Sequence, residues 1–495
     1  MMANVLDRLI GVFNPDKALR LMRSRELLKR AYEGASARDG WRPKRGGASP
    51  NTDHAADGPT LRTRSRSLDQ NVPYMAQGLR SLVAATVGTG ITPNWTGPEA
   101  EKFNDAWVKM VPYLDADGRL DAYGLVSAAY KAMERDGEVL MRVRPRRPTD
   151  GLLVPIQFQL LEIDWLDSSK SQTNGPNTIV NGIEYDVLGR VYGYWLFDQH
   201  PGELVSFKSR KASSSFVAVE KIIHLFTPDR PGQGRGFPRA APVIARVRDL
   251  QLYEDAELQR KNLETRLSVL ASGDVAEMAN AAPGLTNGEA VAIANETGDL
   301  GQLNSGGITR LPIGMEMTVV EPKAAPGYVD YMRFNLQIIA AGYGVTYAMM
   351  TGDGSQANFS SERGLTLNFR REVEVMQWTL LIPKLCQRMC VEFANACELA
   401  GIVKRANYQV EHATPKWDYV NPQQDVNADL MEISGGLSSI SEKLRRRGYK
   451  PDDVFNELAS DVEKLKKLGL LDVLLMMQKG QQMAPEPPPT PPTKK

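Results

Sequence analysis

The longest uninterrupted helical pattern in this chain runs from residue 243 to residue 270. It combines apolar and charged stripes, and none of its 28 residues is proline or glycine. As one α-helix it would extend ~42 Å, at ~1.5 Å per residue. A shorter helical pattern follows at 328–341 and ends at Gly342 and Gly344. The two helices therefore bracket residues 271–327, whose regularly spaced glycines and prolines indicate a small α/β insertion.

A polar, glycine-containing stretch leaves the second helix and leads into a third. It reads GYGVTYAMMTGDGSQANFSSERG, residues 342–364. Ser360 or Ser361 is placed to cap a helix from about residue 362 to residue 400, and Pro383 should kink that helix. The helix has about ten turns and carries polar and apolar residues on several faces. Because one chain offers few partners for such a helix, we expect copies of the chain to pack together.

The middle of the chain indicates a mixed α+β fold. Helical spacing begins at Leu61 and ends at Gly88, and two more helices are expected at 99–113 and 119–134. The period then becomes that of strands, with β-branched and aromatic residues between Asp-Gly and Asn-Gly turns. We expect a largely antiparallel sheet packed on these helices. Its predicted strands lie at 138–145, 155–162, 183–197 and 217–226.

The two ends of the chain differ from this globular part. Residues 1–67 hold fourteen Lys/Arg and seven Asp/Glu, and residues 34–60 are rich in Gly, Pro, Ser and Asp. This basic N-terminal arm, bounded at 1–60, is either a solvated, partly disordered segment or an electrostatic docking arm for an acidic partner. At the other end, the Pro-rich stretch APEPPPTPPTKK predicts a disordered tail.

Two further helices are expected before the tail. One occupies 438–447, between Gly436 and Gly448. The next opens at Pro451, which is followed by two aspartates that suit the first turn of a helix.

The composition describes a globular chain of nearly neutral charge. At ~150 residues per domain, the length suggests about three units. Hydrophobic residues make up 42% and charged residues 24% of the 495 residues. Lys+Arg is 60 against Asp+Glu 59, so the net charge is +1. Proteins that grip nucleic acid tightly through phosphates carry a clear basic excess, so any DNA contact here is expected to be local, weak or transient.

Neither a membrane span nor a secretory signal is expected. No apolar run reaches the ~18 residues that a span needs. The opening stretch MMANVLDRLIGVF has Asp7 and Arg8 inside its apolar part and lacks a small-residue cleavage site. We therefore expect the protein to be made and kept in a reducing cytoplasm. The cysteines share one helical face and lack a fourth zinc ligand, which predicts buried apolar side chains. They are Cys386, Cys390 and Cys397.

Three polar motifs resemble sites of enzyme chemistry, but each is incomplete. TGDGSQANFSSERG (351–364) has neither the lysine nor the preceding strand of a phosphate loop, and Asp353 has no second carboxylate at useful spacing. DADGRLD (115–121) lacks two ligands of a calcium loop, which predicts a surface turn. GQGRG (232–236) has no strand–turn–helix context and predicts a hinge. We therefore expect no catalytic residues, no metal and no cofactor.

Several blocks of the chain resemble the lambda-like family of tailed-bacteriophage portal proteins, and together they are specific. They are SPNTD (49–53), RSRSLDQNVPYMAQGLRSLVAATVGTGITP (64–93), DADGRLDAYGLVSAAYKAMERDGEVLMR (115–142), PDRPGQGRGFPRAAPVIARVRDLQLYEDAEL (228–258) and GVTYAMMTGDGSQANFSSERGLTLNFRR (344–371). The resemblance covers about residues 50 to 470. It implies a ring, usually of twelve copies, at one capsid vertex.

The resemblance also implies how the chain is divided. Portal subunits of this family have a wing, a helical stem, a clip and a crown. The implied parts are an α/β wing at 61–237, stem helices at 238–271 and 328–345, a small α/β clip at 272–327, a tunnel loop at 346–361, a kinked wing helix and return at 362–430, crown helices at 431–478, and a disordered Pro-rich tail at 479–495.

By the same resemblance, the tunnel loop lines the narrowest part of a DNA channel. Its short polar side chains suit flexible contacts with a phosphate backbone, without a strong cationic grip that would make DNA stick. A plain flexible connector between two helices is the alternative. The candidate DNA-channel residues are Thr351, Asp353, Ser355, Gln356, Asn358 and Ser360.

Charged residues flank the loop on both sides. We interpret Arg363, Arg370 and Arg371 as intersubunit salt bridges or a solvated face rather than as direct DNA contacts. The acidic residues Glu254, Asp255 and Glu257 could determine the sign of the charge along the channel wall or at the boundary between subunits.

Two functions of different classes are consistent with this sequence. The first is a non-enzymatic portal in the virion, assembled in the host cytoplasm, through which double-stranded DNA is packaged, retained and ejected. Its expected partners are terminase, major capsid and scaffold proteins, and head-completion or tail connector proteins. The alternative is a nucleic-acid or phosphate-binding enzyme that uses the 351–361 loop with Asp353.

Overall fold

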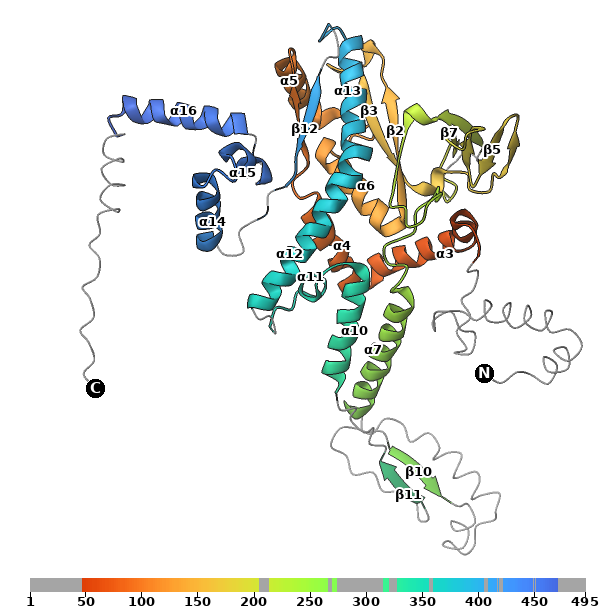
Figure 1. Cartoon of the computed structure of the whole chain (residues 1–495). Helices are drawn as coiled ribbons and strands as arrows, with labels where there is room; N and C mark the ends of the chain where they lie inside the picture. Colours follow the sequence, from red (N-terminus) through yellow and green to blue (C-terminus); the bar gives the residue numbers. More distant parts are fainter. Residues whose placement is uncertain are drawn as a thin grey trace, which may run out of the picture.

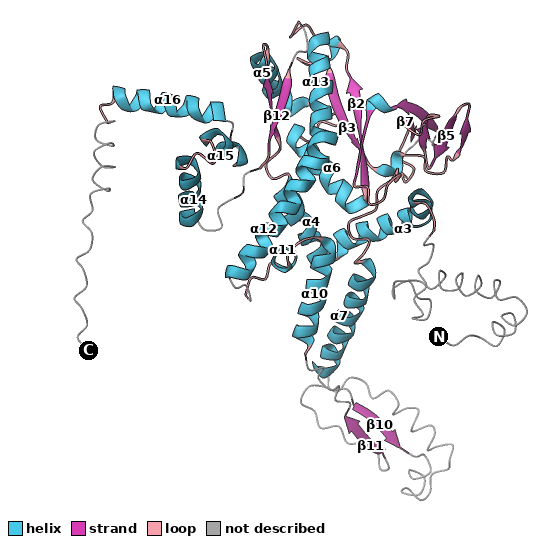
Figure 2. Cartoon of the chain, in the orientation of Figure 1, coloured by secondary structure: helices cyan, strands magenta, loops and turns pink. Residues whose placement is uncertain are grey.

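The computed structural model describes residues 47–203, 213–265, 269–273, 315–319, 327–355, 359–404, 408–415, 417, 422–447, 449 and 451–470. Helices and antiparallel strands together make an α+β architecture, as expected (Figure 2). Figure 1 shows a body of helices and sheets, a pair of helices that projects from it, and a group of C-terminal helices at one side. The predicted Pro-rich tail and most of the predicted N-terminal arm lie outside the described residues.

The body begins with helix α3 (Pro50–Asn71). The Ser49 side chain caps it by accepting the Thr52 N–H at 3.2 Å, and Pro50 occupies the first turn, where no N–H is needed. The expected arm boundary at residue 60 is therefore wrong. Residues 50–60 are polar and rich in turn formers, but side chains such as His54 are buried against the body, so tertiary packing overrides the local pattern.

Helix α4 (Pro73–Thr86) follows after one residue. Because Pro73 has no N–H to continue the preceding helix, the single helix expected from Leu61 to Gly88 is divided in two. Two further helices, α5 (Ala100–Met110) and α6 (Ala122–Asp136), confirm the expected pair at 99–113 and 119–134.

Two antiparallel sheets follow, where one was expected. The three-stranded sheet has the order β3-β2-β9, and the five-stranded sheet runs from β4 to β8 in sequence order. The predicted strand at 183–197 is a hairpin of β6 and β7 around a turn at Asp186, and the one at 217–226 is the end of β8 followed by β9. The bounds are β2 Glu138–Pro145, β3 Ile156–Leu161, β4 Gln172–Asn174, β5 Asn177–Val180, β6 Ile183–Tyr185, β7 Val191–Phe197, β8 Ser214–Ala218 and β9 Ile222–Phe226.

Alternation along β2 places two cores on its two faces. Val139, Met141 and Val143 are buried in the main core with residues of α4, α5, α6 and α13. Leu140 points the other way, into a smaller core that joins the two sheets. A third, two-stranded sheet pairs β1 (Thr92–Thr96) with β12 (Gln409–Ala413), which no sequence pattern indicated.

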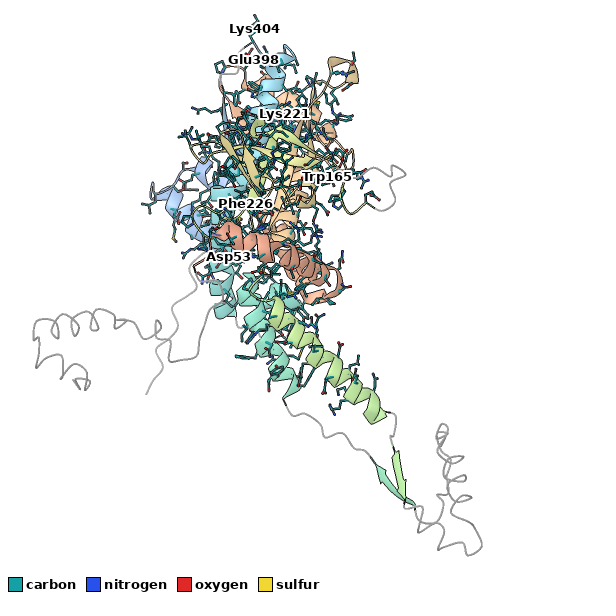
Figure 3. The ribbon with its side chains drawn as sticks, turned by 90° about the vertical axis from the view of Figure 1, so that its right-hand side faces the viewer. Asp53, Trp165, Lys221, Phe226, Glu398 and Lys404 are labelled. Carbon is teal, nitrogen blue, oxygen red and sulfur yellow. The ribbon has the colours of Figure 1, made fainter. Side chains whose placement is uncertain are left out.

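Two helices project from the body, α7 (Ile244–Thr265) and α10 (Tyr328–Tyr343), and we keep for them the name stem helices that the resemblance implies. In Figure 3 they leave the end of the body marked by Asp53, whereas Lys404 marks the opposite end. The predicted helix at 243–270 is too long, because β10 (Val269–Gly273) begins there and pairs with β11 (Met315–Val319). The rest of the predicted clip lies outside the described residues, apart from Gly327 before α10.

A long helical run crosses the body after the stem. It consists of α12 (Phe359–Met376), a π-helical segment Gln377–Cys386, and α13 (Gln387–Leu399). The expected effect of Pro383 takes the form of this π segment, whose wider hydrogen-bond spacing accommodates a residue without an N–H. The three cysteines are buried and free, which confirms their predicted apolar role. Burial raises the pKa of the Cys386 thiol to about 12.

The C-terminal group has three helices, α14 (Pro422–Ser434), α15 (Ile440–Arg446) and α16 (Pro451–Lys467). The last two confirm the sequence prediction. Helix α14 was not predicted, because its polar sequence lacks a strong apolar stripe. No helix in the part of the chain described here is both long and apolar enough to cross a membrane.

Candidate channel loop at the base of the stem

The candidate loop begins where stem helix α10 meets the body. Gly344 ends α10 with a left-handed φ of 76°, which glycine adopts without strain, and Val345 turns back into the core. Near the other end of this stem helix, the Tyr331 ring packs 4.7 Å from the ring of Tyr253 on α7, and Tyr328 lies 5.8 Å from the same ring. The stem helices thus enter the loop region as a packed pair.

Five residues of the expected loop form a short helix, α11 (Tyr347–Thr351). The Thr346 side chain caps it by accepting the Met349 N–H at 3.2 Å, and Gly352 ends it with a φ of 75°. Met350 is fully buried, and Ser81 of α4 donates to the Met349 carbonyl at 3.0 Å. Because this helix is anchored to the body, the segment that can face a channel is shorter than predicted.

Asp353 organises the turn after α11. Its carboxylate accepts the Ser355 N–H at 2.9 Å, and the Tyr347 hydroxyl donates to it at 3.4 Å. The Asp353 N–H in turn donates to the Thr351 hydroxyl at 3.2 Å. Hydrogen bonds from Ser355 and Tyr347, together with the positive charge of Arg333, lower the pKa of Asp353. The turn therefore carries a carboxylate that stays ionised and is held in place by Ser355 and Tyr347.

The structure brings three of the six candidate residues together. Thr351, Asp353 and Ser355 share one hydrogen-bonded turn. Ser360 lies in helix α12, which starts at Phe359, so the predicted loop of 346–361 is wrong at both ends. The other two candidates, Gln356 and Asn358, lie outside the described residues.

Two residues of this site were missed from the sequence. Tyr347 and Arg333 both act on Asp353, the first by hydrogen bonding and the second by charge. Thr346 lies five residues after the end of the predicted helix at 341, where a threonine is typical of a new N-cap, so the position of Tyr347 in a first turn could have been found. Arg333 lies on a different helix, and no local pattern relates it to Asp353.

The charged residues beside the loop are partly paired within the chain. Arg363 lies 3.1 Å from Asp425 of α14, so this arginine joins the long helix to the C-terminal group. Arg370 stacks over the Trp417 ring at 4.9 Å. On stem helix α7, burial and the neighbouring Asp255 raise the pKa of Glu254. The expected intersubunit pairing of these arginines stays a prediction.

The GQGRG loop is not the expected hinge. Arg235 is 1% exposed, and its Nε lies 2.8 and 2.9 Å from the two carboxylate oxygens of Glu138, which is also buried. A β-carbon on Gly236 would lie 2.0 Å from the Gly137 carbonyl oxygen. Glycine is required here because two backbones touch, and the loop is among the most tightly held segments of the body.

Asp115 folds the DADGRLD stretch into the turn that was expected. Its carboxylate accepts the backbone N–H groups of Asp117, Arg119 and Leu120 at 2.8 to 3.0 Å. These bonds occupy the oxygens that a calcium ion would need.

One group of three potential metal ligands occurs among the described residues: Glu162, Asp164 and His200. Arg66 lies 2.6 Å from Asp164 and 3.7 Å from Glu162, so a guanidinium already supplies the positive charge. Asp353 belongs to no such group within the described ranges. The metal-dependent alternative for the channel loop therefore has no ligand set in this part of the chain.

Comparison with known proteins gives a consistent result. The family described as phage portal protein, lambda family, matches residues 35–377. A probable portal protein of Halomonas phage phiHAP-1 is 25% identical over 437 residues, which covers 84% of this chain and 82% of that protein. A portal protein of Escherichia phage N15 is 21% identical over 61% of this chain and 63% of that protein.

Solved structures resemble the chain more distantly. A chain from the neck of a native GTA particle computed with C12 symmetry has a TM-score of 0.42 at 16% identity, covering 78% of this chain and 94% of its own. An HK97 family phage portal protein from Corynebacterium diphtheriae has a TM-score of 0.32 at 12% identity, covering 77% and 99%. The assignment rests on the family match, which spans well over half of the sequence, and the chain belongs to the lambda family of phage portal proteins.

Proposed function

We propose that this protein forms a ring of about twelve subunits at one capsid vertex, through which double-stranded DNA is packaged, retained and later ejected. Family membership is the observation that carries this proposal. The geometry adds support, since a projecting helical stem meets a polar turn at its base (Figure 1). In a ring, copies of this turn would surround a common axis.

Apolar side chains on the stem support assembly between copies. Leu252 and Leu258 on α7 are 57% and 60% exposed, and Val329 and Phe334 on α10 are both 62% exposed. Exposed apolar groups at this density mark an interaction surface. Neighbouring stem helices would cover them, as the sequence pattern already indicated for the longer helices.

The turn at Asp353 is proposed to face the DNA in the channel. Its ionised carboxylate repels phosphates, whereas the hydroxyl groups of Thr351 and Ser355 beside it make only weak contacts. A surface of this kind guides a duplex without holding it. The kinked wing, clip and crown assignments of the flanking segments are part of the same proposal.

No enzymatic activity is proposed for this chain. The energy for packaging would come from a terminase that docks on the ring, and head-completion or tail connector proteins would replace it afterwards. Major capsid and scaffold proteins would surround the ring during assembly in the host cytoplasm, and the ring would remain in the virion.

The native mass of the purified chain, with electron micrographs of the same sample, tests the ring. We expect closed rings with a central hole wide enough for a duplex of about 20 Å. A Leu258→Glu/Phe334→Glu variant should stay folded but fail to close rings, because both side chains are exposed in the single chain. Leu399→Glu, at an exposed position outside the stem, is the matched control. A wild-type chain that stays monomeric even with capsid and scaffold proteins present would refute the proposal.

Packaging by assembled rings tests the turn separately. Asp353→Asn should leave ring assembly unchanged and alter the amount of DNA retained, since the charge at the channel surface changes. Asp105→Asn, at an exposed position of α5 in the body, is the control. Equal retention by Asp353→Asn and wild type would assign the turn to a connector role only.

A further inference from the structure

One face of β2 changes character along its length. Successive residues on this face are Glu138, Leu140, Arg142 and Arg144, because alternate side chains of a strand share a face. Glu138 and Leu140 are buried, and Leu140 packs in the small core that joins the two sheets. Beyond Leu140 the face is left partly open, and arginines occupy it. Arg146 continues the series just past the end of the strand.

Two of these arginines are held in place by glutamines of β3. Arg144 donates from Nε to the Gln159 side-chain oxygen at 2.9 Å, and Arg146 donates from Nε to the Gln157 side-chain oxygen at 2.7 Å. Both glutamines are anchored on their other side. Gln157 donates to the Tyr113 carbonyl at 2.7 Å. The guanidinium groups are therefore oriented before any partner arrives.

Gln159 is anchored in the same way, since its amide donates to the Asp117 carboxylate at 3.2 Å. Two parallel chains of hydrogen bonds result, and each runs from the loop at 113–117 through a glutamine of β3 to an arginine of β2 or the residue just past it. Neutral amides orient the arginines, so their positive charge is kept, whereas glutamates at the same positions would have cancelled it.

The three arginines make no direct ion pair in the described part of the chain, although the charge of Asp117, behind Gln159, acts on Arg144 from a distance. Arg142, Arg144 and Arg146 take part in no contact of 4.0 Å or less with a carboxylate there, whereas other partly buried arginines of the body do, such as Arg66. Partial burial and the neighbouring Arg144 lower the pKa of Arg142. Placing like charges at alternate positions of one strand is unfavourable in the isolated chain.

Two exposed apolar residues are connected to this row of arginines through the backbone. Tyr113 is 59% exposed, and its carbonyl accepts from the glutamine that holds Arg146. Leu153 is 50% exposed and lies two residues before Pro155, whose carbonyl accepts the Arg146 N–H at 2.8 Å. Arginine and tyrosine beside apolar groups are enriched in the centres of protein–protein interfaces.

We propose that the face formed by Arg142, Arg144, Arg146, Tyr113 and Leu153, here called the arginine face, docks an acidic segment of another protein. Alternate residues of a strand lie ~6.6 to 6.8 Å apart. An extended segment with carboxylates at alternate positions has the same spacing, and each carboxylate can take two N–H groups of one guanidinium. Apolar side chains at the two ends of this segment would cover Tyr113 and Leu153.

A protein partner fits this face better than a nucleic acid does. The chain as a whole carries a net charge of only +1, so long-range attraction for a phosphate backbone is small. The exposed apolar groups at the border have no counterpart in a duplex backbone, which is polar and charged. The arginine face also lies in the body, away from the turn at Asp353 that is proposed to meet DNA (Figure 1).

Fluorescence anisotropy with a defined probe tests this inference on the full-length chain. The probe is a fluorescein-labelled peptide in which glutamates alternate with serines and a leucine stands at each end. The reference probes are the same peptide with lysines in place of the glutamates, and a short DNA duplex. Arg142→Gln/Arg144→Gln should weaken binding of the acidic peptide about tenfold, because two exposed pairs of ~0.7 kcal/mol each amount to ~1.4 kcal/mol. Arg64→Gln/Arg190→Gln removes the same charge from exposed positions elsewhere and should leave binding unchanged.

The outcomes separate the possibilities. Loss of acidic-peptide binding in the first variant alone supports the arginine face. Equal losses in both variants would reduce it to a general charge effect and overturn the inference. Tighter binding of the duplex, lost in the first variant, would assign the face to nucleic acid instead. Native mass measured on the same samples shows whether rings still form, so a failure here is distinct from a failure of the ring proposal.

Discussion

Charged side chains at the two ends of one face of β2 differ in whether the chain itself neutralises them. At the start of the strand, the Glu138 carboxylate is fully enclosed and contacts Arg235 and His224, with His54 at 3.4 Å. At the other end, arginines stand at alternate positions, and among the described residues Arg144 and Arg146 are held by the side-chain amides of Gln159 and Gln157. A buried charge needs an opposite charge beside it because it has lost its hydration, whereas a charge at an open surface is stabilised by water until a partner binds.

This difference separates a structural role from an interaction role. Burial alone would raise the pKa of Glu138, but the charge of Arg235 and hydrogen bonds from His224 and His54 hold the pKa well below its ordinary value. The buried end therefore depends on partners inside the chain, and removing one should cost stability. The open end should tolerate the loss of an arginine and reveal its role only in binding.

The largest expected effect is at the buried end. Glu138→Gln leaves the Arg235 guanidinium enclosed without a counter-charge, which should lower the free energy of unfolding by ~3–5 kcal/mol. Urea unfolding monitored by circular dichroism measures this change. Glu372→Gln, at an exposed position of α12, is the control and should change stability little. If the two variants were equally stable, the buried ion pair would not hold the body together.

A smaller loss is expected from Gly236→Ala. The added methyl group would meet the Gly137 carbonyl oxygen at 2.0 Å. Neither group can turn away, because the methyl group is fixed to Cα and the oxygen belongs to the backbone. We expect a loss of ~1–3 kcal/mol, read from the same unfolding curves. Gly364→Ala is the matched control, since nothing lies within 4 Å of its added methyl group and alanine favours a helix. A neutral Gly236→Ala would contradict the close approach.

The buried end should also respond to pH. Burial lowers the pKa of His224 from 6.5, despite the opposing effect of Glu138. The native state then binds fewer protons than the unfolded state, so this contribution is complete above pH ~6.5 and is lost as pH falls through that value. Glu138, with its lowered pKa, adds a loss only below the ordinary range of a carboxyl, around pH ~4.5.

The comparison of wild type with His224→Gln measures the histidine part. We expect the wild type to lose on the order of 1 kcal/mol between about pH 7.5 and about pH 5.5, and the variant to lose less. Both proteins are unfolded with urea at each pH. A variant with an unchanged pH dependence would show that other histidines carry the effect.

The smallest effect is expected at the open end. Arg142→Gln removes one of several like charges and no ion pair, so the free energy of unfolding should change by less than ~0.5 kcal/mol. Thermal unfolding at low and high salt detects any relief of repulsion, which would be larger at low salt. A destabilisation as large as that of Glu138→Gln would mean that Arg142 has a structural partner and would remove the contrast between the two ends.

The sequence predicted helices and strands well where the pattern was periodic and local. Strand β2 has the predicted bounds, and the start of α10 at Tyr328 was also predicted correctly. Prediction from the sequence failed where contacts between residues far apart in the chain determine the local structure. The β1–β12 pair joins segments more than three hundred residues apart, and α3 starts early because the body buries side chains of a polar segment. In the channel loop, helix α11 was missed because a five-residue helix has no measurable period.

The residues alone determined the family, the α+β class, the stem helices and the apolar role of the cysteines. These follow from composition, spacing and motif blocks, which need no knowledge of contacts. Only the tertiary structure decided that GQGRG is a fixed anchor, that Asp353 is held by Tyr347 and Ser355, and that β2 carries a neutralised end and an open basic end. The physical reason is that charge compensation depends on distance in space. Glu138 and Arg235 are 97 positions apart in sequence, yet they make a buried ion pair.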